Sequence, residues 1–123
     1  MLKLSKNAPV EDHGIVQVQT AEGDGYTANV VTFAEKVDHR PLFKGLPDDS
    51  CQCPHWGYVL EGRLTFQFPD EEAVFEAGDA FYVPAGHVPV HEAGTRYVQF
   101  SPTHELEQTS AVIMENMQQL QQA

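Results

Sequence analysis

Thiol and imidazole side chains gather in one short stretch of this 123-residue chain. Both cysteines, Cys51 and Cys53, precede His55, one of six histidines, within the same few residues. In an extended segment alternate side chains point to the same face, so these three side chains would face the same way. Sulfur and imidazole nitrogen are donors that suit zinc in proteins. The stretch therefore predicts a metal or ligand pocket rather than a particular reaction.

The composition is that of one folded domain covering residues 1–123. A hydrophobic content of 41% and an aromatic content of 10% are typical of globular proteins. The net charge of −11 repels phosphate backbones and anionic lipid surfaces, so we expect neither nucleic acid nor a membrane as a partner. No run approaches the roughly 20 apolar residues of a membrane helix. The first residues lack the apolar core of a signal peptide, which predicts a cytoplasmic protein with reduced cysteines.

Short β-rich runs separated by turn residues fill most of the chain. Residues 15–19 and 26–33 flank the turn sequence Gly23-Asp24-Gly25 and predict a hairpin, and residues 63–68 alternate apolar and polar side chains. Shorter runs follow at 58–60, 73–76, 81–83, 88–91 and 97–100. The segment 35–50 contains two prolines and a glycine and predicts a long surface loop near the mouth of a site. The pattern indicates an all-β sandwich or barrel.

The spacing at which apolar residues recur changes near residue 101, from that of a strand to that of a helix. Ser101 before Pro102 matches an N-cap followed by proline at the first helical position, which predicts a helix over about 102–121. Residues at spacings of three and four form one stripe: Leu106, Ser110, Ile113, Met117 and Leu120. We expect this stripe to pack against the barrel, and a dimer contact through the same stripe is the alternative.

The segment from Cys51 to Pro89 resembles the cupin superfamily of small β-barrels. The family's first motif runs H-x-H, three or four residues, E, six residues and G. His55 stands at the Glu position, six residues before Gly62, and the Tyr-Val-Leu-Glu-Gly that ends there is similar to the family's usual sequence. Cys51 then stands at the second His position and Asp49 at the first.

The second cupin motif runs G, five residues, P-x-G, two residues, H, three residues and N. Gly78 and Pro84-Ala85-Gly86 match its first half, whereas Pro89 stands at the His position and Ala93 at the Asn position. The chain therefore keeps the glycine and proline framework of the family, while other residues occupy the usual metal-ligand positions.

The resemblance implies a fold, a range of activities and an assembly. The fold would be a small double-stranded β-helix barrel, or jelly roll, with a core over about residues 14–101 and a C-terminal α-helix. Cupins bind iron, manganese, nickel or zinc at the open end of the barrel, and some are dioxygenases or sugar isomerases. Others bind small molecules or act as sensors, and many are homodimers.

The second motif completes the predicted metal site. Positions 87 and 91 share a strand face with Pro89, which stands at a family ligand position. We favour His87, because it directly follows the rigid Pro84-Ala85-Gly86 turn, and keep His91 as the substitute. The predicted metal ligands are therefore Cys51, Cys53, His55 and His87. This donor set favours Zn²⁺, with Fe²⁺ or Mn²⁺ as the other candidates.

The predicted function is metal-dependent binding of a small molecule, without an assigned reaction. A metal-dependent cupin enzyme of the dioxygenase or isomerase type is the first alternative. A redox or metal sensor that uses Cys51 and Cys53 is the second. Thiol donors count against oxygen chemistry, because non-haem iron oxygenases use two histidines and a carboxylate. The residues alone do not distinguish a binding protein from an enzyme.

Overall fold

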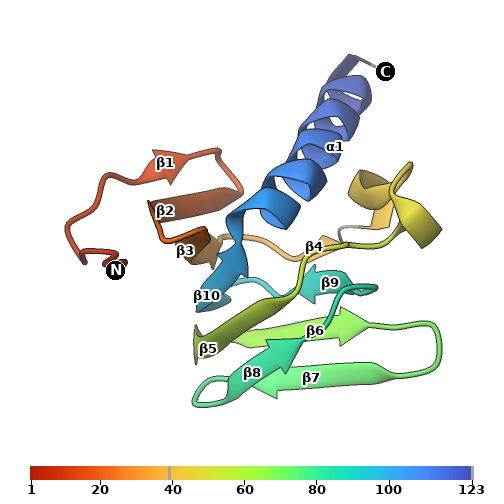
Figure 1. Ribbon diagram of the computed structural model, residues 1–123. Coiled ribbons are helices and arrows are strands. Elements are labelled where there is room, and N and C mark those ends of the chain that lie inside the picture. Colours follow the sequence, from red (N-terminus) through yellow and green to blue (C-terminus); the bar gives the residue numbers. More distant parts are fainter. Residues whose placement is uncertain (39, 123) are drawn as a thin grey trace.

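Two antiparallel sheets and one long helix make up the computed structural model, which describes residues 1–38 and 40–122 (Figure 1). The six-stranded sheet has the order β1-β2-β3-β10-β5-β8, and the four-stranded sheet has the order β4-β9-β6-β7. The strands are β1 (Glu11–Asp12), β2 (Val16–Gly23), β3 (Tyr26–Phe33), β4 (Val37–Asp38), β5 (His55–Glu61), β6 (Arg63–Gln67), β7 (Glu72–Glu76), β8 (Ala80–Val83), β9 (Val88–His91) and β10 (Arg96–Pro102). The remaining elements are the 3₁₀ turns η1 (Arg40–Phe43) and η2 (Pro47–Asp49) and the helix α1 (Thr103–Gln122). The predicted all-β barrel with a C-terminal helix is confirmed.

The main core lies between the two sheets. It is formed by side chains from both sheets, which alternate with outward-facing residues along their strands. Its buried members are Val31, Phe33, Val59, Leu64, Phe66, Phe81, Val83 and Tyr97. Residues 63–68 behave as predicted, since Leu64 and Phe66 are buried and Phe68 packs against the same cluster.

The predicted hairpin is formed by β2 and β3. Gly23 pairs with Tyr26 at its end, which leaves Asp24 and Gly25 as a two-residue turn. Both turn residues have positive φ, 54° and 83°, as a type I′ turn requires. Aspartate tolerates this conformation and glycine adopts it freely, which explains the turn sequence.

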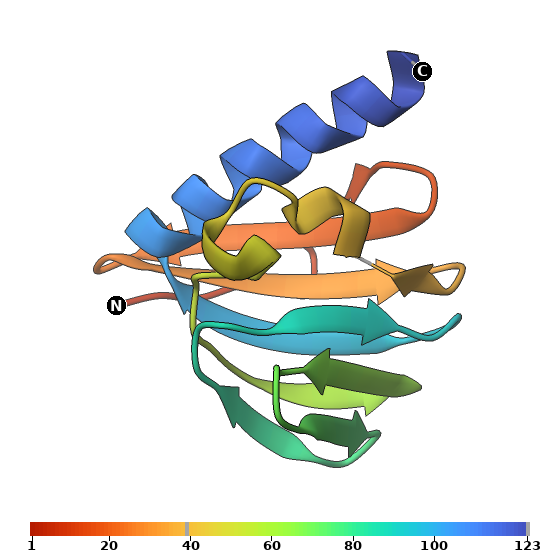
Figure 2. The same cartoon turned by 90° about the vertical axis from the view of Figure 1, so that its right-hand side faces the viewer.

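The segment predicted as a loop, residues 35–50, is more ordered than expected. It contains β4, which pairs with β9, and the turns η1 and η2. Phe43 is buried in a second cluster with Cys51 and Cys53, so this segment folds back to cover apolar surface. Figure 2 shows η1 and η2 beside α1, which runs diagonally across the barrel. The loop therefore lies over one opening of the barrel, together with the helix.

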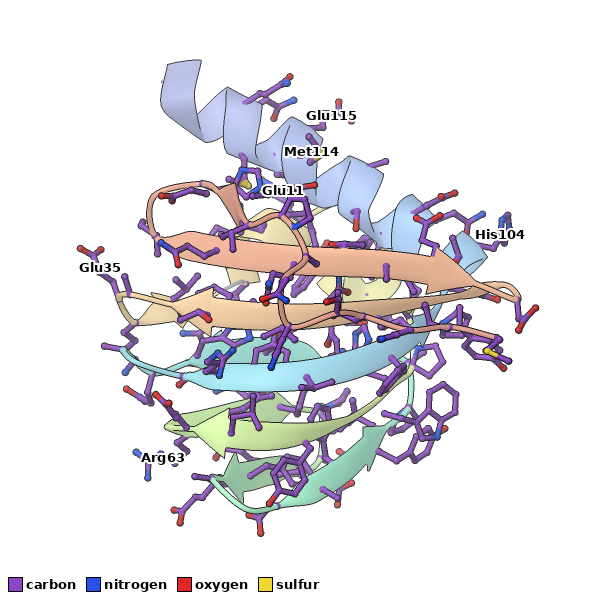
Figure 3. The ribbon with its side chains drawn as sticks, turned by 90° about the vertical axis from the view of Figure 1, so that its left-hand side faces the viewer. Glu11, Glu35, Arg63, His104, Met114 and Glu115 are labelled. Carbon is purple, nitrogen blue, oxygen red and sulfur yellow. The ribbon has the colours of Figure 1, made fainter. Side chains whose placement is uncertain are left out.

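The N-terminal segment covers part of the outer face of the six-stranded sheet. Figure 3 shows it crossing in front of β2. The Gln19 side-chain amide on β2 donates hydrogen bonds to the carbonyl oxygens of Lys6 and Ala8, at 3.3 and 2.8 Å. This segment is attached to the sheet by side-chain contacts rather than by a long strand.

The start of the helix differs from the prediction. Ser101 and Pro102 belong to β10, where they pair with Thr27 and Tyr26, and α1 begins at Thr103. The prediction of Ser101 as an N-cap is therefore wrong. Ser101 is fully buried, and its pairing with Thr27 continues the ladder between β10 and β3 past the predicted start of the helix.

The apolar stripe of α1 packs against its own barrel, as expected. Leu106 and Ile113 contact the cluster of Phe43, Cys51 and Cys53. Other positions of α1 face away from the barrel. Met114 is 62% exposed and His104, at the start of the helix, is also exposed; both are labelled in Figure 3. The side chain of Leu120, the last member of the stripe, lies outside the described residues. Within the described part of the chain, α1 is not apolar enough to cross a membrane.

We predict that Gly57→Ala destabilises the barrel. A Cβ at this position of β5 would lie 2.1 Å from the Val98 carbonyl oxygen and 2.5 Å from the Phe81 ring, so β5 and β10 would have to separate. We expect the free energy of unfolding to fall by about 1–3 kcal/mol in urea denaturation. Val74→Thr, at an exposed position of β7, is the control and should change it by less than about 0.5 kcal/mol. Equal stability of the two variants would contradict this packing.

Candidate metal centre

Three of the four predicted metal ligands come together inside the barrel. One nitrogen of His55, one nitrogen of His87 and the sulfur of Cys51 lie within 4.8 Å of one another. All three side chains are buried, with at most 6% of their surface exposed. We call Cys51, His55 and His87 the three-donor group.

Backbone hydrogen bonds hold Cys51 against His87. The Cys51 N–H donates to the His87 carbonyl at 2.8 Å, and the Gly86 N–H donates to the Cys51 carbonyl at 2.7 Å. Gly86 has a φ of 99°, which favours glycine, and the turn at this point directs the chain back past Cys51. The framework of the second motif thus brings residue 87 beside residue 51.

The ring of His87 has a fixed tautomer. Its Nδ1 lies 2.7 Å from the Pro84 carbonyl oxygen, which can only accept, so Nδ1 carries the proton. Nε2 is then left with a lone pair. This atom is buried and has no hydrogen-bond partner in the part of the chain that the structure describes. A buried lone pair without a partner is costly unless something binds it, and a metal ion fits.

The ring of His55 lies between a hydroxyl and a thiol. Its Nδ1 is 2.7 Å from Ser101 Oγ, and its Nε2 is 3.7 Å from Cys51 Sγ. Histidine ligands of metals commonly donate their other ring N–H to an oxygen, and Ser101 can accept such a bond. Sequence reasoning missed Ser101. Alternation places Ser101 on one face with Tyr97 and Gln99, but only once β10 is known to extend past residue 100.

Burial makes both imidazoles neutral. It lowers the pKa of His55 to about 3, with a further contribution from the positive charge that His87 would carry, and it lowers the pKa of His87. Burial raises the pKa of the Cys51 thiol, while the Cys53 backbone and the Thr109 hydroxyl on α1 act in the opposite direction. Neutral imidazoles are ready to bind a metal ion, whereas the thiol would release its proton on binding.

Cys53 lies apart from the three-donor group. Its sulfur is directed toward carbonyl oxygens, at 3.4 Å from that of Pro54 and 3.9 Å from that of Pro102. Burial, followed by the charge of Cys51, raises its pKa to about 12. Alternation does not apply here, because β5 begins only at His55 and the residues before it are not a regular strand.

His91, the predicted substitute for His87, also lies outside the three-donor group. It ends β9, where its ring stacks on Phe33, with ring centroids 3.9 Å apart and planes at 18°. Its Nε2 lies 3.1 Å from the Tyr97 hydroxyl. Asp49, at the first His position of the family motif, is exposed and accepts a hydrogen bond from the Gly45 N–H.

A cavity of about 270 Å³ adjoins the three-donor group. It is lined by residues of both sheets, by η1 and by α1, so the helix forms part of its wall. The residues that line it are Val18, Asn29, Val31, Phe33, Phe43, Cys51, His55, Phe66, His87, Pro89, His91, Tyr97, Gln99, Leu106, Thr109, Ser110 and Ile113. Three protein donors beside a cavity resemble zinc sites that keep one position open for water or substrate, rather than closed four-ligand sites.

We predict that the metal-free protein loses stability as the pH falls from about 6.5 toward 3. The unfolded chain takes up a proton on His55 near pH 6.5, whereas the folded chain does so only near pH 3, so protons favour unfolding between these values. His55→Gln should remove about 3 kcal/mol of the loss between pH 7 and pH 4, measured by urea denaturation in the presence of a chelator.

His13→Gln is the matched control, because His13 is exposed in the N-terminal part of the chain. Its pH profile should match that of the parent. If His55→Gln also kept the parent profile, His55 would not be a buried neutral imidazole.

Comparisons with known proteins agree with this architecture. The family model described as "Cupin domain" matches residues 51–95. An RmlC-like cupin from Shewanella frigidimarina is 21% identical, with a TM-score of 0.58 over 81% of this chain and 88% of that chain. KdgF from Halomonas sp. is 18% identical, with a TM-score of 0.53 over 80% and 91%. The EutQ protein of Clostridium difficile is 11% identical, with a TM-score of 0.53 over 82% and 74%. No curated protein sequence matches the chain.

Proposed function

We propose that this protein, which belongs to the cupin superfamily, holds one divalent metal ion in the three-donor group and binds a small molecule in the adjoining cavity. The observation that carries the proposal is the buried lone pair of His87 Nε2, which has no partner among the described residues and belongs to a group of three donors within 4.8 Å.

The donor types favour zinc among the divalent ions. A thiolate with two imidazoles is a soft, nitrogen-rich set, which zinc accepts readily, while iron and manganese enzymes draw more on carboxylates. A bound zinc ion would act as a Lewis acid toward a molecule in the cavity. The chain itself contributes the neutral imidazoles, the hydroxyl of Ser101 behind His55, and the cavity walls beside them.

An enzyme remains the second candidate, and one feature of the site favours it. Three protein ligands leave a position for substrate or water, as catalytic zinc sites require. The sensor alternative has less support. Cys53, the second cysteine that a sensor would use, is buried outside the three-donor group, and burial raises its pKa to about 12, so it stays a protonated thiol that reacts slowly with oxidants.

We predict about one zinc ion per chain after purification from zinc-replete cells, measured by elemental mass spectrometry. Cys51→Ser and His87→Ala should each weaken zinc binding about 100-fold or more in a competition titration, because each removes a ligand. Cys53→Ser is the matched control, since its sulfur lies outside the three-donor group, and it should keep the parent affinity.

Loss of zinc in Cys53→Ser with retention in His87→Ala would contradict the proposed ligand set. A full complement of iron or manganese in the parent would favour the enzyme alternative. Absence of metal from every preparation, with no binding on titration, would overturn the proposal.

The homodimer expected from the sequence remains a proposal. The stripe of α1 that suggested it is largely used inside the chain, since Leu106 and Ile113 pack against the second cluster. Sedimentation equilibrium of the untagged protein measures the assembly directly, and a monomer mass at micromolar concentration would contradict a stable dimer.

A further inference from the structure

A second polar group, separate from the three-donor group, lies in the wall of the same cavity. His91 Nε2 and the Tyr97 hydroxyl lie 3.1 Å apart, and both side chains line the cavity. His91 follows His87 by four residues, and Tyr97 precedes Ser101, the partner of His55, by four residues. At about 3.3 Å per residue, each separation is about 13 Å along the strand. The His91–Tyr97 pair therefore lies further along these two strands than the three-donor group, in the wall of the same cavity.

Aromatic stacking holds this pair rigidly. The His91 ring lies against Phe33 on one side, and against Tyr97 with ring centroids 5.4 Å apart and planes at 10°. His91 and Tyr97 are only 2% and 6% exposed. Their polar atoms are consequently fixed in position, as a recognition site requires.

The Tyr97 hydroxyl can make more hydrogen bonds than the one to His91. A phenol has one proton to donate and two lone pairs that accept. Burial raises the pKa of Tyr97, so the hydroxyl keeps its proton. One polar group of a molecule in the cavity can therefore bond to the tyrosine oxygen while the contact with His91 persists.

The remaining wall of the cavity carries no charge and combines apolar side chains with the uncharged polar side chains of Asn29, Gln99, Thr109 and Ser110. Its apolar members include Val31, Phe43, Phe66, Leu106 and Ile113. None of the described residues that line it is Asp, Glu, Lys or Arg, although the chain has 18 acidic and 7 basic residues. A charged group bound here without a partner would be strongly disfavoured. The volume of about 270 Å³ is below the roughly 300–1,000 Å³ of pockets for drug-sized ligands.

We propose that the cavity selects a small, uncharged molecule with an apolar body and two polar ends. One end meets the three-donor group, and the Tyr97 hydroxyl of the His91–Tyr97 pair forms a hydrogen bond with the other. The inference rests on the proposed function, because the first end is directed toward the bound metal ion.

Three ring compounds of similar size separate the requirements. 4-Hydroxybenzyl alcohol has two polar ends and no charge, benzyl alcohol lacks the second polar end, and 4-(hydroxymethyl)benzoate replaces that end with a carboxylate. Each is titrated into the zinc-loaded protein by ligand-observed NMR, at concentrations up to about 10 mM, which covers weak binding. Zinc content is measured on every sample.

We expect 4-hydroxybenzyl alcohol to bind about fivefold more tightly than benzyl alcohol, as one added hydrogen bond provides. The benzoate should bind at least about tenfold more weakly than 4-hydroxybenzyl alcohol. In Tyr97→Phe the advantage of the second hydroxyl should disappear while zinc is retained. Tyr58→Phe, at an exposed tyrosine of β5, is the control and should keep the advantage.

The outcomes distinguish the two proposals. Zinc-loaded protein that binds none of the compounds, prefers the benzoate, or keeps the fivefold preference in Tyr97→Phe overturns this inference and leaves the metal site standing. Failure of the parent to take up any metal overturns the proposed function and, with it, the assignment of the metal-facing end.

Discussion

The hydrogen bond between His87 Nδ1 and the Pro84 carbonyl determines which ring nitrogen of His87 can bind a ligand inside the barrel. It fixes the proton on one nitrogen and leaves the other as a buried lone pair. The turn through Gly86 makes the bond available, and the bridge between Cys51 and His87 places a thiol next to this buried lone pair. The turn, together with the packing of the ring against Phe66 and Phe68, therefore decides where the His87 imidazole points.

A glycine of the first cupin-like motif fixes the backbone at another point of the barrel. Gly62 has a φ of 79°, and a Cβ there would lie 2.7 Å from Thr95. The Thr95 hydroxyl in turn bonds to the backbone of Arg63 on β6. Backbone geometry of this kind does not depend on the ligand side chains, which explains how the chain forms a barrel like those of cupins although other residues stand at the usual ligand positions.

The sequence predicted the fold well, because strands and turns leave local signals. The β2–β3 hairpin followed from its turn residues and from alternation within each strand. The same rule failed for Cys53, because alternation holds only inside a regular strand and β5 begins two residues later. Ser101 was misplaced for a related reason. A serine before a proline has the local signature of a helix start, while the pairing of β10 with β3 is a long-range interaction that no local pattern contains.

The absence of charged side chains from the cavity wall, among the described residues, has a consequence for how the proposed metal ion would arrive. The chain carries a net charge of −11, yet no charged side chain among the described residues lines the cavity, so the acidic groups form an outer shell around a neutral interior. Such a shell raises the local concentration of divalent cations by long-range attraction, which dissolved salt screens over about 10 Å. The rate of metal loading should thus depend strongly on ionic strength, whereas the dissociation rate, set by the buried donors, should depend on it only weakly.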